Sequence, residues 1–496
     1  MNTPLRRVSL VVMGLIVLLV GQATWVQVVR ADDYRSNPAN SRVLLDEYSR
    51  QRGQISAGGE VLATSVATDD RLRYLRTYPS PDAAMYAPVT GYYSQTYGTS
   101  GLERAEDPVL NGSDDRLFIR RISDAVTGRD PSGGNVVLTI DPKVQRAAYS
   151  AMSSKNFQGS VVAIRPQTGE ILAMVSTPSY DPNPLASHDG RVQTQDWTRL
   201  TAADPPELSN RAINELYPPG STFKLVNAAA AIEAGAITPD TPVSAAPNTV
   251  LPDSTTTLEN YDGETCGPGQ TVPFRTAFAK SCNVPFAELA DQIGADRLRA
   301  QARAFGFENP SLQIPLSVQA SQVGALSDGA SLAQSGIGQR DVRITPLQSA
   351  MITATIANGG IPMAPHLVSQ VQGQDLSVVD TTEPDRGARA ISAQTAAALT
   401  SLMQSSEDSG TGSTSGGKIP NVRLASKTGT AEQGPNPKTD PPHTWYTVFG
   451  PVPNPQIAVS VLVEKGGNRG DDATGSSVAG PIGRAVVAAL LAEGGK

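Results

Sequence analysis

The sequence predicts an α+β domain of layered helices and strands, preceded by a membrane anchor and a small N-terminal domain. Three observations support this organisation. Residues 8–29 carry no charge, tyrosine is concentrated before residue 100, and the last strand patterns follow a helical segment that bears a serine and a lysine three positions apart. A closing helix comes after those strands. Late strands between an earlier helix and a terminal helix are typical of an α+β architecture.

Residues 8–29 form a predicted membrane-spanning helix. These twenty-two uncharged residues are enough to cross a bilayer. The pair Arg6-Arg7 precedes the span, so the positive-inside rule predicts that residues 1–7 are cytoplasmic and that the rest of the chain lies outside the cytoplasm. A cleavable signal peptide is the alternative, because Gly21-Gln22-Ala23 resembles a small-residue cleavage site. The apolar pattern continues beyond that site, which favours an uncleaved single-pass anchor in the cell membrane.

Composition argues against several classes of function. The chain of 496 residues has a net charge of −7, which disfavours a nucleic-acid partner. It has three histidines, no H-E-x-x-H motif and no paired C-x-x-C motif, so we expect no metal and no cofactor. The lack of a G-x-S-x-G motif disfavours a Ser-His-Asp hydrolase.

Residues 34–127 form a predicted N-terminal domain that is distinct from the remainder. Eight of the thirteen tyrosines lie before residue 100, and this shift in composition marks a separate module. Residues 128–134 are rich in glycine and are expected to link it to a second domain at residues 136–496. That second domain is long enough to bury a sizeable core.

The second domain contains a series of strand and helix patterns. Asp141 is followed by proline and predicts the N-cap of a helix that ends at Ser153. The Gly/Ser/Thr-rich stretch Ser409–Gly417 is expected to be mobile and to gate the site. Predicted strands cover residues 135–140, 160–164, 171–176, 422–431, 445–450 and 457–464, and further predicted helices cover residues 272–279, 344–358 and 481–491.

Ser221 and Lys224 are the first candidate catalytic pair. They follow the turn Tyr217-Pro218-Pro219-Gly220 and open an alanine-rich helical stretch, where positions i and i+3 share a face. A lysine amine at that spacing can take the proton of the serine hydroxyl. The same S-x-x-K pattern occurs at Ser415–Lys418, but there it lies in a glycine-rich stretch, so its position favours Ser221.

Two further motifs follow this pair in order. Ser281-Cys282-Asn283 begins 60 residues after Ser221, and Lys427-Thr428-Gly429-Thr430 begins 146 residues after Ser281. Only nine of the forty basic residues are lysines, and three of the nine lie in these motifs or directly beside them. Because lysine can lose its proton in a protein and arginine cannot, lysine at these positions indicates base chemistry.

Cys266 and Cys282 are the two cysteines of the chain, and they lie sixteen residues apart. Outside the cytoplasm a disulfide can persist, and a bridge between them would tie the preceding loop to the S-x-N motif. Two buried free thiols are the alternative. We expect the bridge.

With these motifs, the chain resembles the class B penicillin-binding proteins, and most closely the actinobacterial penicillin-binding protein A group. The ordered set S-x-x-K, S-x-N and K-T-G is a signature of penicillin-binding proteins and serine β-lactamases. Arg52-Gly53-Gln54-Ile55 is similar to the start of the family's N-terminal pedestal, and Gly336-Ile337-Gly338-Gln339 to part of its transpeptidase domain. The resemblance implies a β-lactamase/transpeptidase-like domain, an antiparallel sheet flanked by helices, behind a dimerisation-like pedestal. It also implies a D,D-transpeptidase that cross-links peptidoglycan stem peptides and is acylated by penicillin.

The resemblance implies a role for each motif residue. Ser221 attacks the penultimate D-alanine carbonyl of a stem peptide that ends in D-Ala-D-Ala, Lys224 accepts its proton, and Ser281 relays a proton to the leaving D-alanine. Lys427 completes the catalytic set with its positive potential. The resemblance also implies that Asn283 bonds the acyl chain and that the Thr428 and Thr430 hydroxyls bind the substrate carboxylate. Gly429 lets the substrate backbone approach the strand edge. The N–H groups of Ser221 and Thr430 form an oxyanion hole.

Four alternatives stand beside the transpeptidase. A β-lactamase does not need a pedestal or a retained anchor, and a second glycosyltransferase domain does not fit in residues 34–127. A non-catalytic scaffold is expected to have lost a motif residue, and none is lost. A D,D-carboxypeptidase shares every motif. The resemblance further implies β-lactams as ligands, a membrane glycan polymerase as partner, and a role in cell shape or division.

Overall fold

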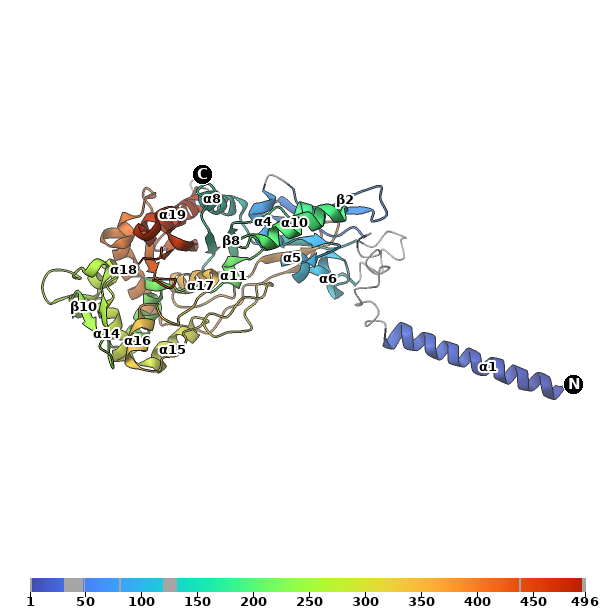
Figure 1. The fold of residues 1–496 in the computed structure, drawn as a ribbon, viewed down its shortest axis with the longest axis horizontal. Coiled ribbons are helices and arrows are strands. Elements are labelled where there is room, and N and C mark those ends of the chain that lie inside the picture. The colour runs from blue at the N-terminus through green and yellow to red at the C-terminus, as the bar shows by residue number, and fades with distance from the viewer. Residues whose placement is uncertain are drawn as a thin grey trace.

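The computed structural model describes residues 2–30, 48, 50–79, 82–118, 132–436 and 439–492 (Figure 1). The expected start of the N-terminal domain at residue 34 and most of the expected linker at 128–134 lie outside these ranges. The described residues form an apolar N-terminal helix, a small mixed domain and a larger domain whose antiparallel sheet is flanked by helices. The predicted α+β fold class is confirmed.

The N-terminal helix α1 (Asn2–Thr24) continues into a π-helical turn, η1 (Trp25–Val29). The run Thr3–Val29 has a mean hydropathy of 2.1 and is long enough to cross a membrane. Its leucine and valine side chains are exposed rather than packed into a protein core. One apolar helix of this kind near the N-terminus indicates a single-pass membrane anchor.

A six-stranded mixed sheet forms the base of the small domain, in the order β14-β13-β6-β1-β2-β3. Its strands are β1 (Ile55–Ala57), β2 (Glu60–Ala67), β3 (Tyr74–Thr77), β6 (Asn135–Leu138), β13 (Val368–Gln372) and β14 (Val378–Thr381). β6 lies parallel to β1 and antiparallel to β13, so segments far apart in the sequence share this sheet. The sequence analysis placed the domain in residues 34–127 alone, because a local pattern predicts a strand but not its partner.

Glu103 holds the small domain together from a fully buried position. Its carboxylate accepts hydrogen bonds from Arg52 Nε and Arg76 Nε, each at 2.6 Å, and from Tyr78 Oη at 3.1 Å. Burial alone would raise the pKa of this carboxyl, but the two guanidinium groups hold it below its usual range. The domain is completed by α4 (Ala83–Thr90), β4 (Tyr93–Ser94), β5 (Gly98–Thr99), α5 (Gly101–Ala105), α6 (Asp107–Leu110) and η2 (Asp115–Leu117).

The larger domain is built on a five-stranded sheet in the order β15-β16-β17-β7-β8, antiparallel throughout. Its strands are β7 (Gly159–Ile164), β8 (Ile171–Thr177), β15 (Ala425–Ala431), β16 (His443–Gly450) and β17 (Ile457–Val463). β15 is an edge strand of this sheet. It carries the K-T-G motif, so one side of that motif's backbone is not covered by a neighbouring strand.

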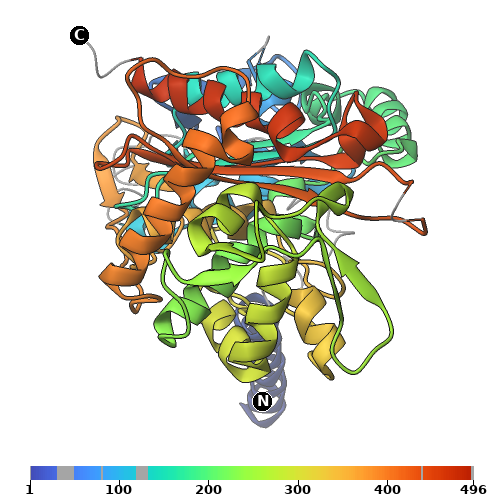
Figure 2. The same cartoon turned by 90° about the vertical axis from the view of Figure 1, so that its left-hand side faces the viewer.

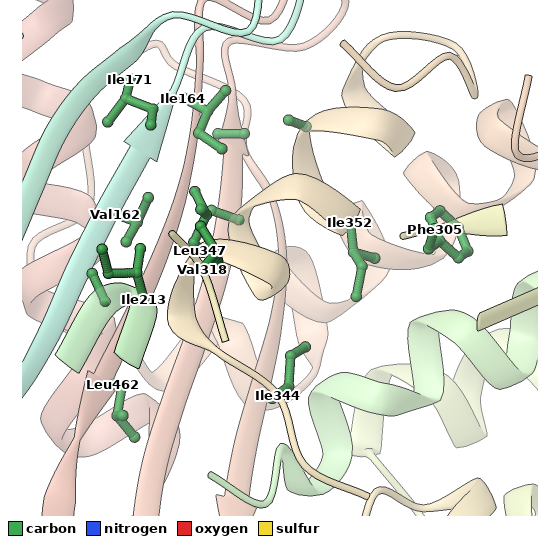
Figure 3. Packing of buried hydrophobic residues seen from close by; sticks show 14 of the residues in the cluster. Val162, Ile164, Ile171, Ile213, Phe305, Val318, Ile344, Leu347, Ile352 and Leu462 are labelled. Atoms are coloured by element: carbon green, nitrogen blue, oxygen red, sulfur yellow. The ribbon is translucent and has the colours of Figure 1, made fainter. Parts of the chain in front are cut away.

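Both faces of the sheet are buried beneath helices (Figure 2). Val161 and Ala163 point into the core formed with α8 (Pro142–Ser153) and α19 (Gly480–Leu491), whereas Val162 and Ile164 point into the opposite core. That second core contains α17 (Pro346–Ala357), and Figure 3 shows Leu347 of this helix beside Val162 and Ile164. Strands covered on both faces explain why these segments are continuous apolar runs in the sequence.

The remaining elements lie mainly on the α17 side of the sheet. They are α9 (Asn183–Ala186), α10 (Gly190–Ala202), α11 (Arg211–Asn214), η3 (Gly220–Phe223), α12 (Lys224–Glu233), β9 (Pro242–Ser244), β10 (Asn248–Val250), β11 (Thr257–Glu259), η4 (Tyr261–Gly263), β12 (Thr271–Pro273), α13 (Phe274–Lys280), α14 (Val284–Ile293), α15 (Ala295–Ala304), α16 (Gly329–Gly336), α18 (Ala393–Ser409), η5 (Thr411–Thr414), η6 (Glu464–Gly466), η7 (Gly470–Asp472) and η8 (Gly475–Ala479).

The structure departs from the expected elements in several places. The strand expected from residue 422 begins at Ala425, and the helix expected at Ser221 begins at Lys224 after a 3₁₀ turn. Residues 271–273 form the strand β12, so the helix expected from residue 272 begins only at Phe274. The stretch Ser409–Gly417, expected to be mobile, contains the turn η5, and its Gly412 and Ser415 are buried. Glycine there allows close packing, because a Cβ at Gly412 would lie 2.7 Å from Ser426 Oγ. Elsewhere the expectation holds: Asp141 caps α8 by accepting hydrogen bonds from the N–H groups of Lys143 and Val144.

We predict that Glu103→Gln destabilises the protein by about 3 kcal/mol, because it removes the carboxylate that pairs with Arg76 and one of the two carboxylates, Glu103 and Asp107, that pair with Arg52. Denaturant unfolding of the wild type and the variant measures the difference. Glu170→Gln is the control, since Glu170 pairs with Arg165 at 2.7 Å in a partly exposed position, and there we expect a change below about 1 kcal/mol. Equal effects of the two substitutions would contradict the prediction.

Candidate active site

Ser221 lies on a tight turn that leads into a buried helix. The turn is the 3₁₀ segment η3, and α12 begins directly afterwards at Lys224. In a 3₁₀ turn, positions i and i+3 are aligned, so the predicted spacing of serine and lysine holds although the first turn is not α-helical. Gly220 has a φ of +51° and its N–H donates to the carbonyl of Gly338 at 2.9 Å, which fixes the turn just before Ser221.

The K-T-G strand β15 packs directly against this turn. A Cβ at Gly429 would lie 3.0 Å from the carbonyl oxygen of Pro219 and 3.0 Å from Cγ2 of Thr222. Trp445 of β16 lies opposite Gly429 in the antiparallel pair of strands, and its Nε1 donates to the Pro218 carbonyl at 3.0 Å. Glycine at position 429 therefore allows the nucleophile's own turn to approach the strand.

Lys224 is fully buried beneath the site. Its Nζ donates to the carbonyl of Ser281 at 2.7 Å and to Oδ1 of Asn283 at 2.8 Å, so the first motif is bonded directly to the second. Desolvation lowers the pKa of this amine well below its usual value, and the charge of Lys427 lowers it further. An amine of this kind can be neutral at moderate pH and can accept a proton from a serine hydroxyl.

Lys427 joins the third motif to the same serine. It is fully buried, and its Nζ donates to Oγ of Ser281 at 2.6 Å and to the carbonyl of Thr428 at 2.9 Å. Burial lowers the pKa of Lys427 to about 7. Because the Ser281 oxygen accepts from lysine, its own hydroxyl proton is left to donate to a substrate atom.

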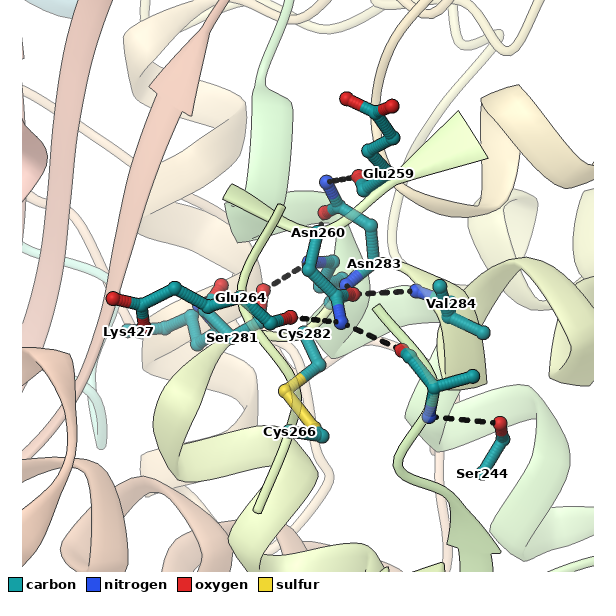
Figure 4. The surroundings of a disulfide bond; sticks show 12 residues. Ser244, Glu259, Asn260, Glu264, Cys266, Ser281, Cys282, Asn283, Val284 and Lys427 are labelled. Carbon is teal, nitrogen blue, oxygen red and sulfur yellow. Dashed lines mark hydrogen bonds between the residues drawn. A yellow bond between two sulfur atoms is a disulfide. The ribbon is translucent and has the colours of Figure 1, made fainter. Parts of the chain in front are cut away.

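Ser281 is held in an unusual backbone conformation at the end of α13, with φ +61° and ψ +35°. A non-glycine residue in this left-handed region is uncommon and needs surrounding structure to maintain it. The next residue supplies part of that support, because Cys282 forms a disulfide with Cys266. The bridge links the loop after η4 to the S-x-N motif (Figure 4).

Asn260 supplies the rest of that support (Figure 4). Its Oδ1 accepts hydrogen bonds from the N–H groups of Asn283 at 2.8 Å and Val284 at 3.0 Å. Its Nδ2 donates to the carbonyls of Ala246 and Glu264, each at 2.9 Å. One buried amide thus bonds four backbone groups and fixes the backbone of Asn283.

The two threonines of the third motif face different surroundings. Thr428 is buried, and its Oγ1 donates to Oγ1 of Thr411 on η5 at 2.6 Å. Thr430 is only half-buried and lies next to the nucleophile turn, since a Cβ at Gly220 would be 2.8 Å from the Thr430 carbonyl. Both residues belong to the edge strand β15, where an extended peptide could add to the sheet.

The structure brings the three sequence motifs into one site. Lys224, Ser281, Asn283 and Lys427 are joined by hydrogen bonds, and Ser221 lies on the turn that abuts β15. Asn260 and Thr411 are contacts that the sequence analysis missed, because neither belongs to a motif. In the described ranges, no group of three or more histidine, cysteine, aspartate or glutamate residues is placed to hold a metal ion.

Comparison with known proteins identifies the family. Residues 159–488 match the family model described as "Penicillin binding protein transpeptidase domain". The chain belongs to the class B penicillin-binding proteins. Residues 52–136 match the "Penicillin binding protein A dimerisation domain". The transpeptidase match covers the three motifs, so the likeness includes the site as well as the fold.

Close relatives of this penicillin-binding protein confirm its resemblance to the penicillin-binding protein A group. It is 56% identical to "Peptidoglycan D,D-transpeptidase PbpA" of Mycolicibacterium smegmatis, over 100% of both chains. It is 55% identical to the protein of the same name from Mycobacterium tuberculosis, over 99% of both chains.

Solved structures give the same result. The ceftriaxone acyl-enzyme complex of penicillin-binding protein A from M. tuberculosis has a TM-score of 0.86 and 54% identity, over 90% of this chain and 100% of that one. The penicillin G acyl-enzyme complex of the same protein has a TM-score of 0.84 and 53% identity, over 89% of this chain and 100% of that one.

We predict that Asn260→Ala loosens the S-x-N motif and destabilises the protein by about 2 kcal/mol, because buried backbone groups lose their hydrogen-bond partner. Amide hydrogen exchange at residues 283 and 284 should become faster, which places the effect at the site. Asn309→Ala is the control, since Asn309 is exposed and bonds only the nearby Ser311 N–H, and it should change stability by less than about 0.5 kcal/mol. Unchanged exchange at the motif in the Asn260 variant would refute its positioning role.

Proposed function

We propose that this chain is a peptidoglycan D,D-transpeptidase that works through a serine acyl-enzyme and is acylated by penicillin. The observation that carries the proposal is the bonded chain from Lys224 through Ser281 to Lys427. It brings together Lys224 as the buried base, Ser281 as the residue whose hydroxyl relays a proton, and Lys427 as the cation that attracts the substrate carboxylate. All three lie next to the turn that bears Ser221. The full-length likeness to peptidoglycan D,D-transpeptidases supports the same reaction.

In the first half-reaction, Ser221 Oγ attacks the carbonyl carbon of the penultimate D-alanine in a stem peptide that ends in D-Ala-D-Ala. The hydroxyl proton moves to Lys224, whose lowered pKa keeps it available as a base. As the tetrahedral intermediate collapses, Ser281 passes a proton to the leaving D-alanine amine and regains one from the neighbouring lysines. The products are free D-alanine and an acyl ester on Ser221.

In the second half-reaction, the amine of another stem peptide attacks the ester. The amine loses a proton to the same base, an amide cross-link forms, and Ser221 regains its hydroxyl. A β-lactam follows only the first half: its strained amide opens, and the ester remains on the serine. A D,D-carboxypeptidase differs only in using water as the acceptor.

Substrate recognition is assigned to the strand edge and the buried cation. The substrate's terminal carboxylate binds near Lys427, with hydrogen bonds from the Thr428 and Thr430 hydroxyls, and Asn283 bonds the acyl chain. The N–H groups of Ser221 and Thr430 point at the oxyanion, where one such donor is worth about 10²–10³ in rate. The edge position of β15 supports this mode, because the substrate backbone can add alongside it.

The domain plan follows the sequence boundaries. We assign residues 1–7 to the cytoplasm, 8–29 to the membrane anchor, 34–127 to the pedestal and 136–496 to the transpeptidase domain, which lies outside the cytoplasm. Strands β6, β13 and β14 extend from this second range into the pedestal sheet. The apolar helix near the N-terminus supports this membrane topology, as does the Arg6-Arg7 pair before most of it. A membrane glycan polymerase is the proposed partner, since the enzyme needs newly made glycan strands at the membrane surface.

The first test is the intact mass of the ectodomain after incubation with penicillin. We expect a single adduct of one penicillin that persists for many minutes. The Ser221→Ala variant should show none, because it lacks the nucleophilic oxygen. Fast loss of the adduct with penicillin turnover would indicate a β-lactamase, and no adduct on a folded protein would favour the scaffold. A thioester substrate is then given to the enzyme with a D-amino acid as acceptor, and the products are compared. Transfer of the acyl group to the D-amino acid indicates a transpeptidase, and hydrolysis alone indicates a carboxypeptidase.

We also predict a bell-shaped pH dependence for the second-order rate constant of acylation. At low pH the rate falls because Lys224 gains a proton and can no longer act as the base. At high pH it falls because Lys427 loses the charge that attracts the ligand carboxylate, with a midpoint near its pKa of about 7. Rates measured with a fluorescent penicillin across the pH range give both limbs.

Lys427→Arg is the diagnostic variant for this profile. Arginine keeps its charge at every accessible pH, so the alkaline fall should disappear while the acid fall remains. If the alkaline fall persists in this variant, another group causes it and the assignment to Lys427 is wrong.

A further inference from the structure

A buried ion pair lies behind the K-T-G strand, and no step of the proposed reaction uses it. Glu407 of α18 and Arg484 of α19 meet at 2.5 Å, and their side chains are 9% and 1% exposed. Glu407 also accepts hydrogen bonds from Tyr446 Oη at 2.6 Å and from the Ser426 hydroxyl. Ser426 directly precedes Lys427, so the pair is bonded to the catalytic strand itself.

The same arginine holds the turn η5 in place. Arg484 donates to the carbonyls of Ser415 and Gly412, the latter at 2.9 Å. On the other side of the turn, Gly410 abuts the S-x-N helix, since a Cβ there would lie 2.1 Å from the carbonyl oxygen of Ala279. The turn is therefore fixed between the second and third motifs.

From this fixed turn, Thr411 reaches the third motif. Its Oγ1 accepts the hydrogen bond of Thr428 Oγ1 at 2.6 Å. A hydroxyl carries one donor and two acceptor positions, so Thr411 can reverse and donate to Thr428 once Thr428 donates to a bound carboxylate. Two hydroxyls aligned in this way polarise each other and strengthen the final bond.

We propose that Thr411 is a positioning residue for carboxylate recognition, and that the Arg484–Glu407 pair is the brace that holds it against Thr428. The inference rests on the proposed role of Thr428 in binding the substrate carboxylate. Thr411 touches no reacting atom. It orients the Thr428 hydroxyl, which binds the carboxylate, and the brace keeps Thr411 in place.

The experiment compares acylation by penicillin G with acylation by its methyl ester, which lacks the carboxylate charge. The ratio of the two second-order rate constants measures carboxylate discrimination. Thr411→Val keeps the size of the side chain and removes the hydroxyl, and we expect discrimination to fall about fivefold, as for the loss of one hydrogen bond between neutral groups. Thr411→Ser should restore it, because the hydroxyl returns.

Thr414→Val is the matched control. Thr414 lies on the same turn, is exposed, and bonds only to the Thr411 carbonyl at 3.0 Å, so discrimination should equal that of the wild type. A purely structural role for Thr411 would slow the acid and the ester equally and leave their ratio unchanged, which would overturn the proposal.

Thr428→Val separates failure of the inference from failure of the proposed function. If this variant loses discrimination and Thr411→Val does not, the positioning role is wrong. If Thr428→Val keeps full discrimination, the assigned carboxylate contact itself is wrong.

The brace is tested with the double variant Glu407→Leu/Arg484→Met, which removes both buried charges together. In folded protein it should lose discrimination as Thr411→Val does, and full discrimination would overturn the brace.

Discussion

The burial of two lysine amines around one serine determines how the rest of the site is built. Lys224 and Lys427 both bond to Ser281, and both are removed from solvent. A buried ammonium group is stable when a carboxylate pairs with it. No carboxylate among the described residues contributes to the pKa of either lysine. Desolvation is therefore the largest effect, and it lowers the pKa of both amines. A lowered pKa makes an amine available as a base at moderate pH, and the Ser281 hydroxyl, which accepts from Lys427 Nζ, is a group that can relay a proton.

Lysine and arginine have different roles among the buried charged groups of this protein. The buried carboxylates around the larger sheet are paired with arginine: Glu407 with Arg484, and Glu464 with Arg211 at 3.0 Å. Glu464 also accepts from Tyr217 Oη at 2.8 Å, four residues before the nucleophile. Arginine keeps its charge when buried, which suits a permanent structural pair. Lysine, scarce in this chain, occupies the two buried positions of the site where the pKa of the amine is lowered.

The sequence was sufficient for the three motifs and the α+β class, and insufficient for what surrounds them. An ordered motif set and apolar runs are local signals, so Ser221, Lys224 and strands such as β17 could be predicted. Asn260 and Thr411 could not, because each acts through a contact with a residue distant in the sequence. The stretch that contains Thr411 was expected to be mobile from its glycine and serine content. Those small residues instead permit backbone contacts as close as that of Gly410 with Ala279.

The left-handed backbone of Ser281 shows how firmly contacts within the protein hold this site. A strained residue persists only where its neighbours leave it no alternative. Here those neighbours are the Cys266–Cys282 bridge on one side, the Asn260 amide on the other, and two lysine amines on the serine's own oxygens. Because each contact is made between groups of the protein itself, the ordering entropy is lost during folding and not during acylation. The ligand therefore meets donors and acceptors that are already oriented, which is the condition under which electrostatic stabilisation of a transition state is largest.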